Sequence, residues 1–181
     1  MRKINEIFYS LQGEGYHTGT PAVFVRFSGC NLRCSFCDTR HEEGVMMSDE
    51  EIVQAVCHYP ATMVILTGGE PSLFVDDTLV EMLHRAGKWV AMETNGTHKV
   101  PDNLDWITCS PKEGGDLHIQ RMDELKVVYQ GQSLEPYESL PVRHRFLQPC
   151  SGANIAETVA CVKSHPRWRL SLQTHKLIDI P

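Results

Sequence analysis

The chain has 181 residues, of which 41% are hydrophobic, and its formal net charge is −6 at pH 7. This length suffices for one well-buried core and predicts a single domain over residues 1–181, while the acidic balance argues against a nucleic-acid partner, which needs clustered Lys and Arg. No apolar run reaches membrane length and the start, MRKINEIFYS, lacks the apolar stretch of a signal peptide, so we expect a cytoplasmic protein with no membrane contact.

Strands are predicted by the apolar, β-branched-rich runs at about 22–28, 62–67, 89–93, 105–109, 124–129, 144–148 and 168–173. Three helices are predicted between some of these strands. The first follows a capping-box pattern of Ser48 and Glu51. The second, at about 77–87, ends at Gly87, a C-cap-type glycine, and the third stops before Pro166.

Polar motifs follow directly on the carboxyl ends of the apolar runs, namely FSGC, TGGEP, METNGT, CSPK, LQPCSG and LQTHK. In barrels of parallel strands, active-site loops gather at this end. A full eight-fold barrel of about 250 residues does not fit this length. We therefore predict an α/β fold that is a partial, open barrel of about six parallel strands with about three main helices.

Three cysteines, Cys30, Cys34 and Cys37, have the spacing C-x3-C-x2-C. Three thiolates on a [4Fe-4S] cluster leave one iron free to bind another ligand. The same cysteines with His41 have the donor set of a Cys3His zinc site, so this stretch alone leaves both metal sites open. The other cysteines are expected to be free thiols of a reducing compartment, with Cys57 and Cys161 in helical cores and Cys109 and Cys150 beside motif loops.

The run TGGEP favours the iron–sulfur alternative. Glycines at a strand end, such as Gly69, let the backbone approach a ligand closely, and the carboxylate of Glu70 is suited to an ammonium group. Together with the cysteine triplet about thirty residues upstream, this run resembles the radical S-adenosylmethionine (SAM) superfamily. In that superfamily the amino and carboxylate groups of SAM chelate the open iron.

The amino-terminal run FYSLQGEGYHTGTPAVFVRFSGCNLRC narrows the resemblance. Gln12 and Glu14 supply an amide and a carboxylate suited to the edge of a guanine-like or pterin ring, and Arg26 supplies a fork for a carboxylate. Beside FCDT, TGGEP, ETNG, SPK, LQP and QTHK, this run is similar to the 7-carboxy-7-deazaguanine synthase family over about residues 4–181.

This resemblance implies a set of site residues. The cluster ligands would be Cys30, Cys34 and Cys37, and the hydroxyl of Thr39 would bind Mg²⁺. The substrate would contact Leu11, Gln12, Gly13, Glu14, Arg26, Thr67, His175 and Pro181. SAM would lie against Phe36, Cys37, Asp38, Gly69, Glu70, Glu93, Asn95, Ser110, Pro111, Lys112, Gln148, Pro149, Cys150 and Ser151.

The resemblance also implies the reaction. A 5′-deoxyadenosyl radical takes hydrogen from C6 of 6-carboxy-5,6,7,8-tetrahydropterin, and ring contraction with loss of ammonia gives 7-carboxy-7-deazaguanine. Glu14 and His175 are the candidates for moving protons late in the rearrangement. Segment 1–20 would bind substrate, and segment 174–181 would close the site, with the terminal carboxylate of Pro181 accepting hydrogen bonds from the substrate. The implied partners are an external electron donor such as flavodoxin or ferredoxin and a second copy in a homodimer.

Two other functions share part of the pattern. A radical SAM activase of a glycyl-radical enzyme has the cysteine triplet and the GGEP strand end, but it acts on a protein and does not need LQGEG together with Arg26. A non-enzymatic zinc or iron–sulfur module shares only the cysteines, and would leave GGEP, ETNG and SPK unexplained.

Overall fold

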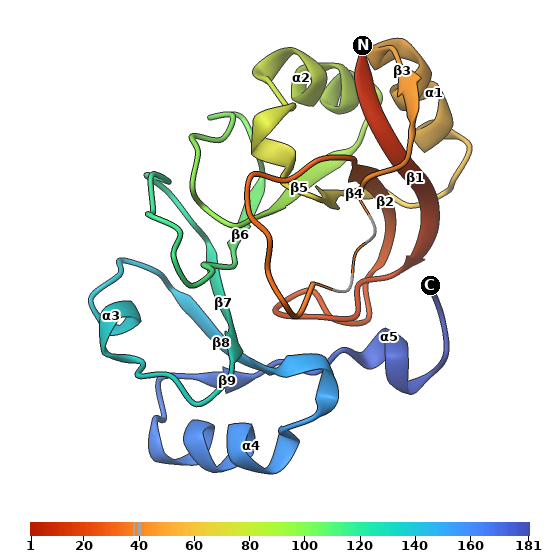
Figure 1. The fold of residues 1–181 in the computed structure, drawn as a ribbon. Coiled ribbons are helices and arrows are strands. Elements are labelled where there is room, and N and C mark those ends of the chain that lie inside the picture. Colours follow the sequence, from red (N-terminus) through yellow and green to blue (C-terminus); the bar gives the residue numbers. More distant parts are fainter. Residues whose placement is uncertain (38, 40) are drawn as a thin grey trace.

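The computed structural model describes residues 1–37, 39 and 41–181, and the strands that it contains form a single sheet (Figure 1). They are β1 (Arg2–Leu11), β2 (Pro21–Phe27), β3 (Val45–Met47), β4 (Met63–Gly68), β5 (Trp89–Thr94), β6 (Trp106–Cys109), β7 (Glu124–Tyr129), β8 (His144–Pro149) and β9 (Arg169–Leu170). Their order across the sheet is β3-β1-β2-β4-β5-β6-β7-β8-β9. The chain thus has the partial-barrel α/β fold that the motif positions predict.

Neighbouring strands from β2 to β9 run parallel, whereas β1 pairs antiparallel with both β2 and β3. The strand predicted at about 168–173 is reduced to the two residues of β9. The sequence did not predict β1, because charged and polar residues such as Glu6 interrupt its apolar pattern. Its backbone is nevertheless paired with β2 from Ile4 to Leu11, apart from one irregularity.

The three predicted helices are α1 (Asp49–Cys57), α2 (Asp77–Arg85) and α4 (Ile155–Ser164). The capping box of α1 is confirmed, since Ser48 Oγ accepts from the Glu51 amide at 3.2 Å and the Glu51 carboxylate accepts from the Ser48 amide at 2.7 Å. Gly87 follows α2 with φ of +75°. The additional short elements are α3 (Glu135–Glu138), α5 (Thr174–Leu177) and the 3₁₀ turns η1 (Pro71–Leu73) and η2 (Cys150–Gly152).

Alternation along the strands divides the core into an outer and an inner layer. Val23, Val25 and Phe27 of β2 face outward and pack with residues of α1 and α2, such as Ile52 and Leu79. The intervening residues face the inside of the barrel, where the apolar side chains are Ala22, Phe24, Met63, Ile65 and Ala91. Side chains two residues further along β2, β4 and β5 share this inner face.

The free cysteines differ from expectation at one position. Cys57 is exposed at the end of α1, so its expected place in the core is wrong. The apolar face of α1 is formed by Ile52 and Val56 instead. Cys161 is half-buried and packs against the cluster that includes Leu125 and Leu147, and Cys109 is buried.

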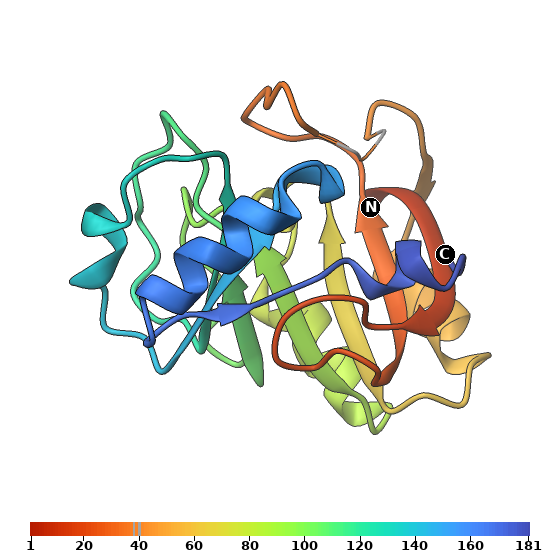
Figure 2. The same ribbon diagram turned by 90° about the horizontal axis from the view of Figure 1, so that it is seen from below.

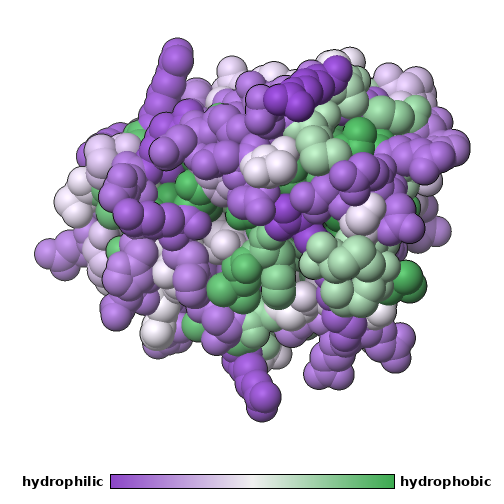
Figure 3. Space-filling model, turned by 90° about the horizontal axis from the view of Figure 1, so that it is seen from above, coloured by the Kyte–Doolittle hydropathy of each residue, from purple (hydrophilic) through white to green (hydrophobic). Residues whose placement is uncertain are grey.

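The face seen in Figure 3 is mainly hydrophilic, with smaller apolar areas between the polar side chains. Among the described residues, no helix is both long and apolar enough to cross a membrane. Seen from below, the parallel strands point toward the end where the loop after β2 projects (Figure 2). The segment after β9 runs back across the molecule to β1 and carries α5.

Candidate active site

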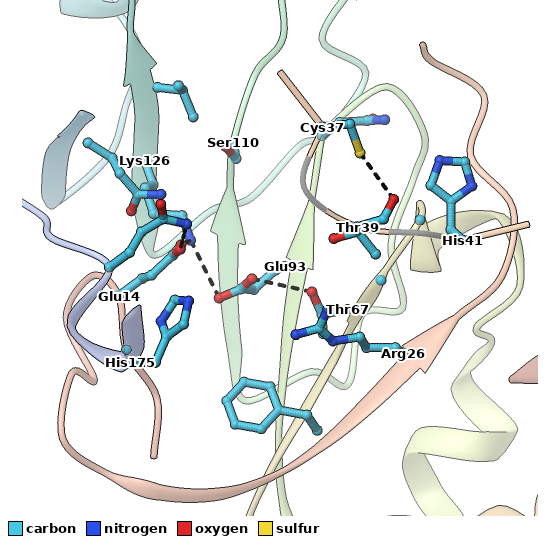
Figure 4. Close-up of a pocket in the computed structure, with 18 of the residues that line it drawn as sticks. Glu14, Arg26, Cys37, Thr39, His41, Thr67, Glu93, Ser110, Lys126 and His175 are labelled. Atoms are coloured by element: carbon cyan, nitrogen blue, oxygen red, sulfur yellow. Dashed lines mark hydrogen bonds and ion pairs between the residues drawn. The ribbon is translucent and has the colours of Figure 1, made fainter. Parts of the chain in front are cut away.

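A cavity of about 450 Å³ lies where the loops after the parallel strands meet (Figure 4). Its lining brings together residues that the sequence places far apart: Leu11, Gln12, Gly13, Glu14, Arg26, Cys30, Cys34, Phe36, Cys37, Thr39, Thr67, Gly69, Glu70, Glu93, Asn95, Ser110, Lys112, Gln148, Pro149, Ser151, His175 and Pro181. Nearly all of the sequence-derived site residues therefore surround one space.

Among the described residues, two sequence-derived ones, Pro111 and Cys150, are not part of this lining. Asp38 lies outside the residues that the structure describes. Pro111 is buried between Ser110 and Lys112, which line the cavity on either side of it. Cys150 begins the turn η2, where its amide donates to Asn154 Oδ1 at 2.8 Å.

The inner face of the sheet positions a polar layer directly above the apolar one. Arg26 and Thr67 are register partners on β2 and β4, and Thr67 Oγ1 donates to Glu93 Oε2 of β5 at 3.3 Å. The Arg26 guanidinium lies 5.1 Å from the centre of the Phe8 ring, and its Nε is 3.3 Å from Glu6 Oε1. Figure 4 shows Arg26, Thr67 and Glu93 directed into the same part of the cavity.

A second polar group joins the loop after β1 to β5 and β7. Gln12 donates from Nε2 to Glu93 Oε1 at 2.9 Å and accepts at Oε1 from the Glu14 amide at 3.1 Å. Glu14 forms a short ion pair with Lys126 and accepts from Gln173 Nε2 at 2.8 Å. Glu93, which the resemblance assigned to SAM, is thus bonded to residues that the same resemblance assigned to the substrate.

Burial raises the pKa of Glu14, but the charge and hydrogen bond of Lys126, with further contributions from Gln173 and His175, outweigh it and lower that pKa. Burial also raises the pKa of Glu124, to about 7, against the opposing charge of Lys126 and the hydrogen bond from the Tyr16 amide. Lys126 thus favours the ionised form of Glu14, whereas burial favours the protonated form of the neighbouring Glu124.

Sequence reasoning missed Lys126, which lines the cavity with a side chain only 5% exposed. The available signal was a lysine inside the apolar strand ELKVVY, since a buried lysine is rare unless it is paired. Other lining residues without a sequence-derived role are Phe8, Phe24, Leu32, Gly68, Val128, Gln173, Lys176 and Ile180.

The loop after β2 carries the cysteine triplet. The Leu32 amide donates to Cys30 Sγ at 3.4 Å. Burial raises the pKa of the Cys30 thiol, and the nearby Glu70, Cys34 and Cys37 raise it further. Cationic iron would relieve this accumulation of negative charge, so the pocket suits thiolate ligands only with a metal present.

A [4Fe-4S] cluster and a single zinc ion place different demands on the thiols. No group of three or more His, Cys, Asp or Glu side chains in the described part of the chain is gathered so as to hold one metal ion. A zinc site requires its ligands to converge within about 2.3 Å of one point, whereas each thiolate of a [4Fe-4S] cluster binds a different iron.

The strand end at Gly69 is tightly packed against the cysteine loop. A Cβ at Gly69 would lie 1.9 Å from the Gly29 carbonyl oxygen. The Gly69 and Glu70 amides donate to the carbonyls of Phe27 and Gly29, each at 2.9 Å. These bonds hold the end of β4 beside the loop that begins at Cys30, which brings the cysteine and glycine motifs to one wall.

Glu70 is only 1% exposed and already has several partners. It accepts from Thr94 Oγ1 at 2.5 Å, from the Asn95 amide at 2.7 Å and from the Ser72 amide at 3.1 Å. These bonds tie β4, η1 and the loop after β5 together. The carboxylate that the sequence offered to an ammonium group thus supports the strand ends that form the cavity wall.

The next strand ends contribute further polar groups. Lys112 donates from Nζ to the Ser110 carbonyl at 2.8 Å and to Ser110 Oγ at 2.5 Å. Burial lowers the pKa of Lys112, and the charge of Lys126 lowers it further. On β8, Gln148 Oε1 accepts from Ser171 Oγ at 3.0 Å.

The segment after β9 is anchored on the amino-terminal loop. The amide and the hydroxyl of Thr174 both donate to the Gly13 carbonyl at 2.9 Å. A Cβ at Gly13 would lie 2.0 Å from His175 Nδ1, so a glycine is needed for this close approach. Ser10 Oγ donates to the Pro181 carbonyl oxygen at 2.7 Å.

Comparison with known proteins agrees with this geometry. The family model of the radical SAM superfamily matches residues 24–128. The 7-carboxy-7-deazaguanine synthase of Bacteroides thetaiotaomicron is 69% identical over 99% of both chains, and the enzyme of that name from Bradyrhizobium diazoefficiens is 42% identical over 98% of both. The crystal structure of QueE from Escherichia coli is 30% identical with a TM-score of 0.78, and the match covers 94% of this chain and 93% of the other. The chain belongs to the 7-carboxy-7-deazaguanine synthase family of radical SAM enzymes.

Proposed function

We propose that the cavity converts 6-carboxy-5,6,7,8-tetrahydropterin to 7-carboxy-7-deazaguanine with loss of ammonia. The observation that carries this proposal is that two sets of residues line the same cavity. The cysteine loop with Gly69 forms one part of the lining, and the polar layer of Arg26, Thr67 and Glu93 forms another. Family membership supports this radical SAM lyase activity over activation of a protein partner.

Three cofactors serve the family: a [4Fe-4S] cluster, SAM and Mg²⁺. When bound, they supply the radical that removes hydrogen from the substrate and a cation for the substrate carboxylate. Cys30, Cys34 and Cys37 would hold the cluster. Thr39, which lines the cavity near Cys37, would contribute its hydroxyl to Mg²⁺, as suits a hard cation.

SAM would be held by the strand ends on the cysteine side of the cavity. Gly69 offers close backbone approach, and Ser110, Lys112 and Gln148 offer polar side chains. Phe36 adds an apolar surface. Further contacts would come from Glu70, Asn95, Pro149 and Ser151.

The substrate would occupy the opposite side. Arg26 would bind its carboxylate, because a guanidinium presents paired donors to a carboxylate. Glu14 and Glu93 would accept hydrogen bonds from the N–H groups of the pyrimidinone edge through their carboxyl oxygens, and Gln12 would present its amide group beside them. Orientation of the reacting hydrogen is then the main contribution of the protein.

Proton movements late in the rearrangement are assigned to Glu14 and His175. Both line the cavity, and Figure 4 shows them on the same side of it. His175 would move a proton at a ring nitrogen, because an imidazole changes charge near neutral pH. Glu14 would take up a proton only transiently, since Lys126 favours its ionised form.

Two segments would enclose the substrate. Residues 1–20 provide the loop with Gln12 and Glu14, and residues 174–181 cover that loop from outside. The hydrogen bonds from Thr174 to Gly13 and from Ser10 to Pro181 join the two segments to each other. They support the proposal that both segments enclose the substrate within a single domain.

The electron would come from an external donor such as flavodoxin or ferredoxin. Cys37 is exposed at the molecular surface, so a donor that docks there would come close to the cluster. Arg33, also exposed on this loop, would favour an acidic donor. We assign the enzyme to the cytoplasm, where such donors and reduced thiols coexist.

A homodimer is supported by the edge strand β3. Val45 is 69% exposed and Met46 is 53% exposed, and β3 stands at the end of the sheet order. Exposed apolar residues on an edge strand favour pairing with another chain.

The proposed activity is tested by anaerobic incubation of the reconstituted protein with SAM, a reductant, Mg²⁺ and the carboxypterin. Mass spectrometry should detect 7-carboxy-7-deazaguanine, with 5′-deoxyadenosine as the second product. Reactions without SAM and with a Cys34→Ala variant serve as controls. Turnover of SAM without any deazaguanine, at full iron loading, would contradict the assigned substrate.

A further inference from the structure

Lys126 is a buried cation in the middle of the carboxylate network. It lies on β7 between Leu125 and Val127, which are 0% and 1% exposed and belong to the apolar core. Its own side chain faces the cavity, with 5% of its surface exposed. Placing a lysine here costs free energy unless its charge is compensated, so the position calls for an explanation.

The ammonium group bridges two carboxylates that come from different parts of the chain. Its Nζ pairs closely with Glu14 Oε2, from the loop after β1, and lies 3.5 Å from Glu93 Oε1, on β5. Without a cation between them, these two carboxylates would repel each other and one would tend to take up a proton. Lys126 therefore lies between the two carboxylates and compensates negative charge there.

The neighbours of the pair complete its orientation. Gln173 donates to Glu14, while Gln12 and Thr67 donate to Glu93. Each carboxylate thus has at least one donor besides Lys126, which leaves other lone pairs available toward the cavity. A substrate edge that presents several N–H donors requires acceptors in such an ionised, fixed arrangement.

We infer that Lys126 is a positioning residue, whose ammonium group bridges Glu14 and Glu93 and holds them at a fixed separation so that both accept hydrogen bonds from the N–H edge of the pterin. This inference rests on the proposed function. It assigns no contact with SAM or with the reacting carbon to Lys126. Its loss should therefore weaken substrate binding and leave the assembly of the cofactor site intact.

The test compares Lys126→Met, Lys126→Arg and Lys88→Met with the wild-type holoenzyme. Lys88 is the control, because its Nζ also donates to partly buried groups, the carbonyls of Tyr59 and Ala61, but it does not line the cavity. Lys126→Met should raise the KM for the carboxypterin roughly thirtyfold or more, as expected for the loss of one partner of a buried charge pair. Iron content and SAM affinity should match the wild type, and Lys126→Arg should give an intermediate KM.

A purely structural role would not move two further measurements. In a Glu14→Gln background, Lys126→Met should raise the KM by a smaller factor, because one carboxylate no longer needs the cation. In Lys126→Met alone, the acidic limb of kcat/KM for the pterin should move to higher pH. The charged and titratable groups around Lys126 are Glu14, Glu93, Glu124 and Lys112, and His175 lies close to Glu14.

The outcomes separate this inference from the proposed function. Absence of deazaguanine with the wild-type enzyme counts against the proposed function. Normal wild-type turnover together with a wild-type KM and a wild-type acidic limb for Lys126→Met overturns the role of Lys126.

If Lys126→Met fails to fold, the KM of Lys126→Arg for the carboxypterin tests the role of Lys126 instead. A raised KM with unchanged SAM affinity supports positioning, because the planar guanidinium cannot replace the ammonium without moving the carboxylates, and a wild-type KM overturns it.

Discussion

At the scale of single residues, the site depends on the alternation of side chains along each strand. Arg26 shares the inner face of β2 with Phe24, and Thr67 shares that of β4 with Ile65. The same β2 strand that supplies outward-facing core residues thus supplies an inward-facing guanidinium. A one-residue change in register would place Arg26 outside the barrel.

Arg26→Ala should abolish deazaguanine formation while uncoupled cleavage of SAM remains measurable, because Arg26 is assigned to the substrate carboxylate and not to SAM. Loss of one partner of a buried charge pair costs on the order of 2–5 kcal/mol. Product and 5′-deoxyadenosine are quantified in the same anaerobic reaction. Arg85→Ala, which removes an exposed ion pair with Glu81, is the control and should behave as wild type. Normal product formation by Arg26→Ala would refute the assignment.

Glu124 should make stability depend on pH. Burial raises its pKa to about 7, from an ordinary value of 4.5. Between these values the unfolded chain loses a proton that the folded protein keeps, so this contribution to stability is present below pH 4.5 and is lost as the pH rises through 7. Glu124→Gln should remove this loss, which amounts to about 3 kcal/mol at alkaline pH.

Urea unfolding of the wild type and of Glu124→Gln at pH 5 and at pH 8 checks this prediction. The free energy of unfolding of Glu124→Gln, relative to that of the wild type, should be higher at pH 8 than at pH 5. Glu135→Gln, at an exposed position of α3, should show no such change. A constant difference between Glu124→Gln and the wild type would mean that Glu124 is ionised throughout this range.

At the scale of elements, loops carry the cysteines and part of the substrate contacts, whereas Arg26, Thr67 and Glu93 lie on strands. The loop after β2 holds the cysteines, and it is bonded to the end of β4 through Gly69 and Glu70. The loop after β1 holds Gln12 and Glu14, and it is bonded to the segment with α5. The sheet holds these loops at fixed distances from one another.

The loop after β2 should bind iron as a unit. Anaerobically reconstituted protein should be brown and contain about four irons per chain. Replacement of Cys30, Cys34 or Cys37 by Ala should remove this iron, as measured by colorimetric assay and absorbance. Cys57→Ala, at an exposed position far along the chain in α1, should retain it. Stoichiometric zinc without iron in the wild type would argue against a cluster.

The tail 174–181 should tighten substrate binding. Deletion of Ile180 and Pro181, or Ser10→Ala, removes the bond between Ser10 Oγ and Pro181, and each should raise the KM for the pterin. The deletion should have the larger effect, because both residues line the cavity. Leu177→Ser, at a position 67% exposed on α5, is a control for changes in the tail that do not reach the cavity. Unaltered substrate kinetics in the deletion variant would show that the tail only covers the surface.

At the scale of the whole molecule, the open barrel leaves two different sheet edges. Both edge strands are short, and the one at β3 exposes Val45 and Met46. Sedimentation of the holoenzyme should give the mass of a dimer, and Val45→Lys should shift it toward the monomer by placing a charge on this edge. Thr78→Lys, on the exposed start of α2, controls for added charge. A monomeric wild type at micromolar concentration would rule out the proposed homodimer.

Local patterns in the sequence determined much of this protein. The periodicity of the apolar runs predicted the parallel strands and the three main helices, since alternation depends only on neighbouring residues. The cysteine spacing and the GGEP strand end, both contained in short segments, indicated the radical SAM superfamily. The position of polar motifs after the strands predicted that they would surround one space.

Only the tertiary structure decided which distant residues meet. Lys126 and Glu14 are 112 positions apart, and Ser10 and Pro181 are 171 apart. Whether such residues make contact depends on which strands become neighbours and on the path of the loops between them, and no local period records either. For the same reason, β1 was missed, because its pairing with β2 outweighs its weak apolar pattern, and Lys126 became recognisable as a buried counter-ion only when β7 lay beside the loop after β1.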